Sequence, residues 1–142
     1  MQYIGTKIIN AEPMTRLLYN SFRGWKLPAD ENGEDEGYLV EYLDGGKANV
    51  PTHKGYVSWS PKEQFDAAYI ALPAGSEALP PHQQRVVAEK AALSAKYDAL
   101  HKFINGGTFF PMINAEEQER LRRQLKVMGE YSGILAARIS FF

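Results

Sequence analysis

The sequence predicts an α+β fold, in which a small antiparallel β-sheet lobe with short helices precedes a C-terminal antiparallel two-helix hairpin. Three observations support this prediction. Segments rich in β-branched and aromatic residues recur in the first half of the chain. Apolar residues recur every three or four positions in the last third, as on one face of a helix. A single short loop, GGTFFPMIN, divides that last third into two helical patterns, which is typical of antiparallel helix pairs.

The hairpin should consist of one helix from about Pro81 to Asn105 and a second from about Asn114 to Ser140. The buried stripes should contain Val86, Leu93, Tyr97, Leu100 and Ile104 in the first helix, and Leu121, Leu125, Met128, Leu135 and Ile139 in the second. Gly106 and Gly107 end the first pattern. Asn114 can cap the second helix, with Glu117 three residues later. The spacing also predicts two exposed ion pairs, Glu116–Arg120 and Glu119–Arg123.

The front half reads as strands and short helices. We expect strands at Tyr3–Ala11, Gly37–Leu43 and Gly55–Trp59, the first broken by Glu12-Pro13. A short helix over residues 14–23 should end at Gly24 in the left-handed conformation. Ser60 should cap a further helix, with Pro61 in its first turn and Glu63 completing a capping box.

The predicted organisation is an α+β lobe over residues 1–73, a Pro/Gly-containing linker over 74–80 and the hairpin over 81–142. Formal charge divides along similar lines. Residues 1–73 hold 7 Lys and Arg against 10 Asp and Glu, a net −3, whereas residues 74–142 hold 9 against 7, a net +2. The whole chain has a formal net charge of −1, which argues against bulk binding of DNA or RNA.

Composition excludes several classes of protein. The 142 residues include no cysteine, so disulfides and thiolate metal sites are impossible. No apolar run approaches the ~20 residues that span a bilayer, and the N-terminus does not resemble a signal peptide. We therefore expect no membrane association and a cytoplasmic location.

No catalytic motif is present: there is no GxSxG, P-loop, GxGxxG after a strand, or HExxH. The histidines His53, His82 and His101 are scattered without metal-ligand spacing. The acidic run LPADENGEDEG lacks the ligand spacing of a calcium loop, so it should be solvated. We expect neither an enzyme nor a bound cofactor or metal.

Residues suited to ligand binding concentrate in the hairpin. Phe103, Phe109 and Phe110 could stack on a base that the amide of Asn105 or Asn114 fixes. The forked N–H donors of an arginine guanidinium suit phosphate oxygens. The candidate phosphate-binding residues are Arg122, Arg123 and Arg138, with Arg23 in the front lobe. The alternatives are that the phenylalanines close the hairpin end or an oligomer interface, and that the arginines pair with acids or lie along the surface.

Three front segments, YIGTKIINAEPMT, FRGWKLPADENGEDEGYLVEYLDGGK and GYVSWSPKEQFDAAY, resemble a small module found in many phage proteins. The rear segments EKAALSAKYDALHKFI and QERLRRQLKVMGEYSGILAARI resemble the helical hairpin of phage anti-CBASS nucleotide sponges. Together they resemble the phage Thoeris anti-defence proteins of the first type.

This resemblance implies a non-enzymatic inhibitor of bacterial immunity, acting in the cytoplasm of the infected cell. Such a protein binds glycocyclic ADP-ribose, and in some relatives cyclic di- or trinucleotides, and keeps the ligand from its effector without cleaving it. The resemblance also implies a homo-oligomer, from dimer to hexamer, and a pocket built from aromatic, amide and arginine side chains of the types named above. The alternative function is an adaptor whose hairpin docks a host or phage protein.

Overall fold

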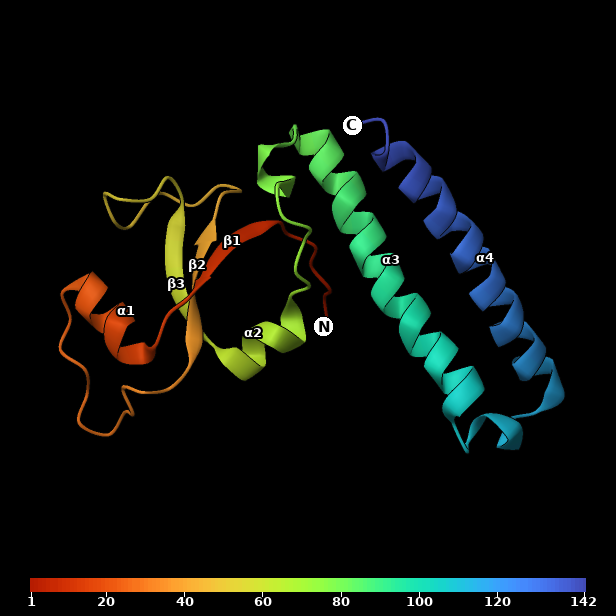
Figure 1. Cartoon of the computed structure of the whole chain (residues 1–142). Helices are drawn as coiled ribbons and strands as arrows, with labels where there is room; N and C mark the ends of the chain where they lie inside the picture. The colour runs from red at the N-terminus through yellow and green to blue at the C-terminus, as the bar shows by residue number, and fades with distance from the viewer. The chain divides into compact units, whose positions relative to one another are not determined.

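A computed structural model describes all 142 residues and confirms the α+β class (Figure 1). The chain divides into two compact units, Met1–Tyr69 and Ile70–Phe142. The first unit contains the β-sheet and two short helices, and the second contains two long helices. None of the helices is long and apolar enough to span a membrane.

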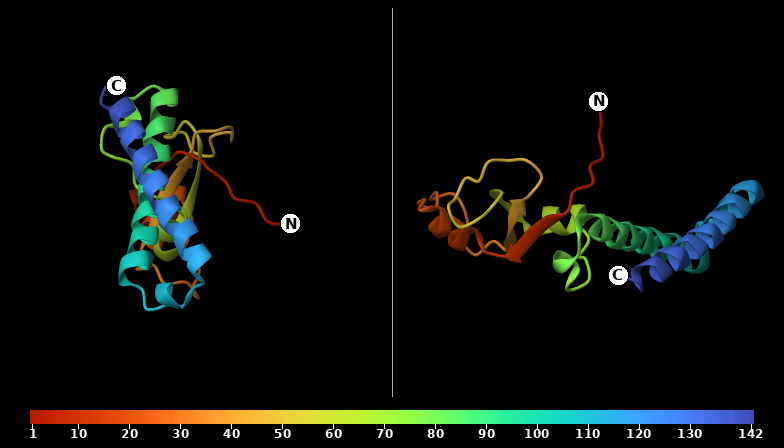
Figure 2. Two further views of the ribbon diagram at one scale, coloured as in Figure 1. Left: turned by 90° about the vertical axis from the view of Figure 1, so that its right-hand side faces the viewer. Right: turned by 90° about the horizontal axis from the view of Figure 1, so that it is seen from above.

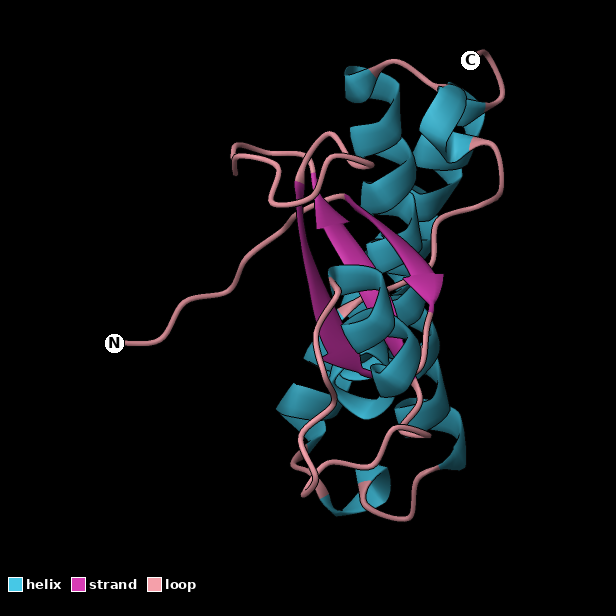
Figure 3. Cartoon of the chain, turned by 90° about the vertical axis from the view of Figure 1, so that its left-hand side faces the viewer, coloured by secondary structure: helices cyan, strands magenta, loops and turns pink.

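The sheet of the N-terminal unit has three antiparallel strands in the order β1-β2-β3 (Figure 3). They are β1 (Ile9–Pro13), β2 (Gly37–Tyr42) and β3 (Tyr56–Pro61). The expected first strand, Tyr3–Ala11, is shifted: β1 begins later and includes Pro13, which is paired with Tyr38. Proline is tolerated there because β1 is an edge strand, and a missing N–H costs no hydrogen bond on the side that has no neighbouring strand.

Each face of this sheet is covered by one helix. On one face, Leu39 and Val57 are almost fully buried with Tyr19 of α1 (Arg16–Arg23). On the other face, Phe65 of α2 (Lys62–Ala68) stacks on Tyr38 with 4.0 Å between ring centroids. Alternation along β2 sends consecutive side chains to opposite faces, which explains the two small cores.

The helix ends of the N-terminal unit show one confirmed and one wrong prediction. Gly24 ends α1 with φ 70°, as expected for a left-handed cap. The predicted capping box of the next helix is wrong. Ser60 and Pro61 belong to β3, paired with Tyr38 and Gly37, and α2 begins at Lys62 without any side-chain cap. Strand pairing holds Ser60 in the sheet, so its hydroxyl does not reach the amides of the helix.

A buried carboxylate holds the long connection between β2 and β3. Glu41 is only 9% exposed, and its Oε1 accepts hydrogen bonds from the backbone amides of Gly55 (3.0 Å) and Lys54 (2.9 Å). Its Oε2 accepts one from Asn10 Nδ2 at 3.1 Å. These bonds, the Gly55 amide first, lower the pKa of Glu41 below its ordinary value, against the opposing effect of burial. The connection is therefore anchored to the sheet by an ionised side chain.

The acidic loop of the N-terminal unit is organised by one arginine. Arg16 pairs with Glu31 at 2.9 Å and with Asp35 at 3.1 Å, and its guanidinium lies over the Trp59 ring. Hydrogen bonding to Glu31, then the attraction of both acids, raises the pKa of Arg16. Two of the five acids in the run thus neutralise a cation of the same unit.

The C-terminal unit is a helical hairpin of α3 (Pro81–Gly106) and α4 (Ala115–Ile139), which lie side by side (Figure 2). Both helices match the expected bounds to within a residue. Every residue of the two predicted stripes is buried or half-buried, with Leu135 fully buried. A short 3-10 turn precedes the hairpin (η1, Ser76–Ala78) and another lies in its loop (η2, Phe110–Met112). Two helices cover only one face of each other, so much of the hairpin surface remains apolar and exposed.

Candidate functional site

The loop end of the hairpin brings three of the predicted site residues together. Phe110, in η2, is 4% exposed and packs edge-to-face on Phe103 of α3, with 5.9 Å between centroids. The Arg122 guanidinium of α4 lies over the same Phe110 ring, 5.0 Å from its centroid. Arg122 also donates a hydrogen bond to Gln118 Oε1 at 3.3 Å. We call Phe103, Phe110 and Arg122 the loop-end cluster.

Phe110 has a structural role within this cluster. Its ring is buried, with Arg122 over the ring and Phe103 in edge-to-face contact, so it offers almost no surface to a ligand. Phe109 next to it is 69% exposed, and Phe103 is 36% exposed. A flat ligand ring therefore has access to Phe109 and to part of Phe103 rather than to Phe110.

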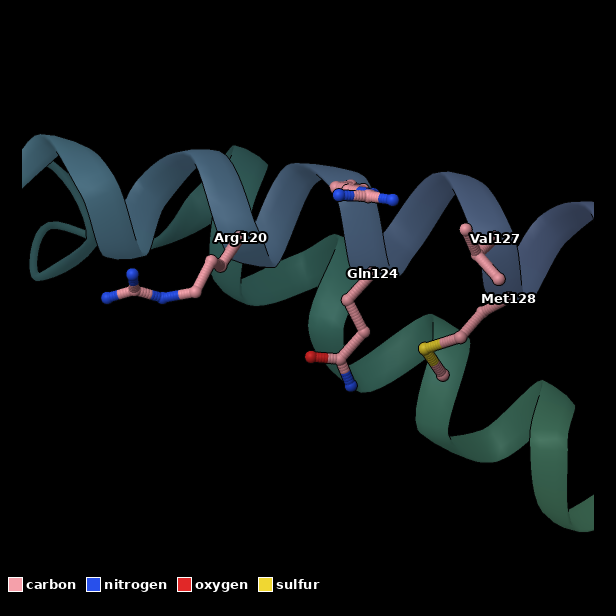
Figure 4. Close-up of a pocket in the computed structure, with 5 residues that line it drawn as sticks. Arg120, Gln124, Val127 and Met128 are labelled. Atoms are coloured by element: carbon pink, nitrogen blue, oxygen red, sulfur yellow. The ribbon is translucent and has the colours of Figure 1, made fainter.

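On the side of α4 away from Arg122, the helix surface forms an open pocket of about 330 Å³. Its lining residues are Arg120, Arg123, Gln124, Val127 and Met128, and we call it the arginine pocket. Figure 4 shows Arg120 and Gln124 extending from the same side of α4, as expected for positions four apart on a helix. Two guanidinium groups, an amide and an apolar floor meet here, which suits an anion attached to a flat or apolar body.

The charges along this part of α4 are only partly paired. Arg120 contacts Glu117 at 2.6 Å and Glu116 at 4.0 Å, so the predicted Glu116–Arg120 pair is present at the limit of an ion pair. The predicted Glu119–Arg123 pair is absent. Arg123 is exposed and has neither an ion pair nor a side-chain hydrogen bond, so its five N–H donors are available to a ligand.

Both candidate amides take part in local structure. Asn114 is the N-cap of α4, and its Oδ1 accepts a hydrogen bond from the Glu117 amide at 2.9 Å, as the sequence predicted. Asn105 donates from Nδ2 to the His101 carbonyl of its own helix at 2.9 Å. Each amide keeps half of its hydrogen-bonding groups for a ligand. Asn114 is fixed by its capping role, whereas Asn105 is at an exposed helix end.

The remaining two candidates lie elsewhere. Arg138 is exposed and follows Arg122 by 16 residues on α4, which at 1.5 Å per residue separates them by about 24 Å along the helix. Arg23 belongs to the N-terminal unit, where its guanidinium lies 4.2 Å from the Trp25 ring centroid and donates to the Tyr19 hydroxyl. Neither forms part of the loop-end cluster or the arginine pocket.

Sequence reasoning did not identify Gln124 and Val127 as site residues, and it treated Arg120 only as an ion-pair partner. Their spacing in the sequence does place these residues on one face of a helix. Arg120, Gln124, Val127 and Tyr131 follow one another at steps of four, three and four, beside the stripe that faces α3. No group of three or more His, Asp or Glu side chains is placed to hold a metal ion.

The comparison with known families concerns this hairpin. Residues 80–141 match the family model Sequestin. The Sequestin match spans α3, the loop and all of α4, which is somewhat less than half of the chain. Its name denotes sequestration, which fits a protein that binds a small ligand better than it fits an enzyme. No curated protein and no solved structure matches the chain.

Proposed function

We propose that the protein is a phage anti-defence factor that binds and sequesters a cyclic ADP-ribose isomer, and with it cyclic di- or trinucleotides, to block Thoeris or CBASS immunity. It acts in the cytoplasm of the infected cell and releases its ligand unchanged. The observation that carries the proposal is the Sequestin match over the same hairpin that bears the arginine pocket.

The chemistry of the hairpin supports an anionic ligand. Arg123 has no protein partner, and Arg120 is held by acids at one side only. A pyrophosphate would take the forked donors of these two arginines, while Arg122 lies on another side of α4, over the Phe110 ring. The exposed ring of Phe109 and the accessible part of Phe103 provide a stacking surface for a base, and Asn105 provides an amide. These contacts require no catalytic base or nucleophile.

An open pocket on a single helix face leaves much of a nucleotide in water, so a second copy of the chain would complete the site. The surface beside the arginine pocket carries exposed apolar side chains at steps of four, three and seven. They are Val127 (53% exposed), Tyr131 (40%), Ile134 (60%) and Phe141 (89%). We infer that homo-oligomers form through this outer stripe and enclose the ligand between subunits.

The test is calorimetry on the full chain with glycocyclic ADP-ribose, followed by a panel of cyclic di- and trinucleotides. Binding should be lost or weakened at least tenfold in Arg123→Ala and Arg120→Ala, which alter the two arginines of the pocket. Arg85→Ala, an exposed arginine at the other end of the hairpin, should bind as the wild type does. Chromatography after denaturation should return the ligand intact. Absence of heat and of thermal stabilisation with every ligand would refute the proposal, because saturation at 100 times Kd adds ~2.7 kcal/mol.

The outer stripe also favours a second candidate, an adaptor that docks a host or phage protein on α4. Three large apolar side chains on one face of α4, Val127, Tyr131 and Ile134, are the pattern of a helix-binding surface. The adaptor would give no response to cyclic nucleotides and would remain monomeric alone, while a partner protein would protect Ile134 and Tyr131 from hydrogen exchange in their helix. If a cyclic nucleotide binds the wild type and Arg123→Ala abolishes this binding, the result supports sequestration over the adaptor.

A further inference from the structure

A second cavity, of about 510 Å³, lies at the opposite end of the hairpin from its loop. Its walls come from three parts of the C-terminal unit: Leu79 before α3, Val87, Lys90 and Ala91 on α3, and Ile139 and Phe142 at the end of α4. It shares no residue with the arginine pocket. Its volume falls in the range of about 300–1,000 Å³ that is usual for small-molecule sites.

The segment that closes one side of this cavity is held in place by its own hydrogen bonds. Ser76 is 6% exposed and donates from Oγ to the Pro73 carbonyl at 2.6 Å. Gly75 takes a left-handed conformation with φ 86°, which turns the chain into η1. Gln84 of α3 donates from Nε2 to the Leu79 carbonyl at 2.7 Å. A preformed wall reduces the ordering cost of binding.

One charged side chain lines this cavity, and it has no counter-ion. Lys90 is half-buried, and its Nζ donates to Ser132 Oγ of α4 at 3.3 Å. No carboxylate lies within 4.0 Å of its Nζ. Glu89, its neighbour on α3, bonds the Tyr131 hydroxyl instead. A partly desolvated ammonium beside apolar walls favours an anion, since the reduced exposure to water strengthens the attraction.

We propose that this cavity binds a small organic monoanion with an apolar body, such as an aromatic or aliphatic carboxylate or sulfonate. The anionic group pairs with Lys90, and the apolar body packs on Val87, Ala91 and Ile139. A single lysine suits a single charge, whereas the several arginines at the other end of the hairpin suit a polyphosphate. The two sites are therefore chemically distinct, and this one does not depend on nucleotide sequestration.

The test uses two fluorescent probes on the full chain: 1-anilinonaphthalene-8-sulfonate, and its neutral relative N-phenyl-1-naphthylamine. In Lys90→Gln the sulfonate probe should bind at least fivefold more weakly, and the neutral probe should bind unchanged. Lys96→Gln, which removes an exposed lysine of the same helix, is the matched control and should affect neither probe. Arg123→Ala should also affect neither probe.

Variants that fill the cavity test whether the probes bind inside it. Ala91→Phe should weaken both probes at least fivefold, and Ser94→Leu provides a second filling variant if the first does not fold by circular dichroism. Unchanged affinity of both probes in the filled variants would mean that the dyes bind other exposed apolar surface, and would overturn the proposal. Equal weakening of both probes by Lys90→Gln would overturn the role of its charge.

Discussion

The Arg122 guanidinium lies over the buried ring of Phe110, 5.0 Å from its centroid, and joins α4 to the loop of the hairpin. An arginine over an aromatic face contributes about 0.5–1 kcal/mol at an exposed site. The same contact orients one cation of the candidate ligand surface. Stability of the loop end and display of positive charge are thus coupled through one pair of residues.

Phe110→Ala should destabilise the C-terminal unit by about 3 kcal/mol, because it leaves a cavity under Arg122 and Phe103. Phe109→Ala removes the same ring from a side chain that is 69% exposed and should change stability by less than about 0.5 kcal/mol. Urea unfolding followed by far-UV circular dichroism measures both. Equal losses in the two variants would contradict the structural role assigned to Phe110.

The two candidate amides should differ in the same assay. Asn114→Ala removes the N-cap of α4 and should cost about 1 kcal/mol. Asn105→Ala loses only an exposed bond to a carbonyl of its own helix and should be nearly neutral. If Asn105 contacts ligand, its alanine variant will lower affinity for glycocyclic ADP-ribose while leaving the unfolding midpoint unchanged. A lower affinity accompanied by a lower midpoint would indicate an indirect effect.

Glu41 should make the stability of the N-terminal unit depend on pH. Its folded-state pKa is lowered, so its ionised form stabilises the fold above the unfolded value of about 4.3, and this contribution is lost as pH falls through the folded pKa. Glu41→Gln should cost about 1–3 kcal/mol at neutral pH and much less in acid. Trp25 and Trp59, the two tryptophans, both lie in this unit, so their fluorescence reports its unfolding.

Glu12→Gln is the control for this measurement, because Glu12 is an exposed acid of β1 with no ion pair. It should leave the urea midpoint unchanged at both pH values. If Glu41→Gln lowers the free energy of unfolding by the same amount at neutral and acid pH, the carboxylate acts by its shape and not by its charge.

Features that depend on interactions within one segment could be predicted from the sequence, whereas features that depend on distant residues could not. The bounds and buried stripes of α3 and α4 follow from periodicity within a single segment, and the structure confirms them. The anchoring by Glu41 joins positions 31 and 14 residues away, at Asn10 and Gly55, so no local pattern reveals it. Ser60 was misassigned because pairing with Tyr38, 22 residues earlier, overrides a local capping sequence.

Prediction of the candidate site from local sequence is limited in the same way. Residue types alone indicated aromatic rings, amides and arginines in the hairpin, and the structure brings Phe103, Phe110 and Arg122 together. Sequence could not tell that Phe110 would be covered while Phe109 stays exposed, because adjacent loop residues have no fixed period. Nor could it tell which of two acids each arginine would choose, since exposed ion pairs differ by only a few tenths of a kcal/mol.

Self-association through the outer stripe gives the last prediction. Ile134 is 60% exposed in the middle of the stripe, and a carboxylate in its place would have to be buried unpaired between subunits. Ile134→Glu should therefore shift the chain to monomer in sedimentation velocity. Ala136→Glu introduces the same charge two positions away, about 200° around the helix, and should leave the oligomer intact. If Ile134→Glu stays associated, the interface lies elsewhere. If the monomeric variant also binds glycocyclic ADP-ribose at least tenfold more weakly, the second copy contributes to the pocket.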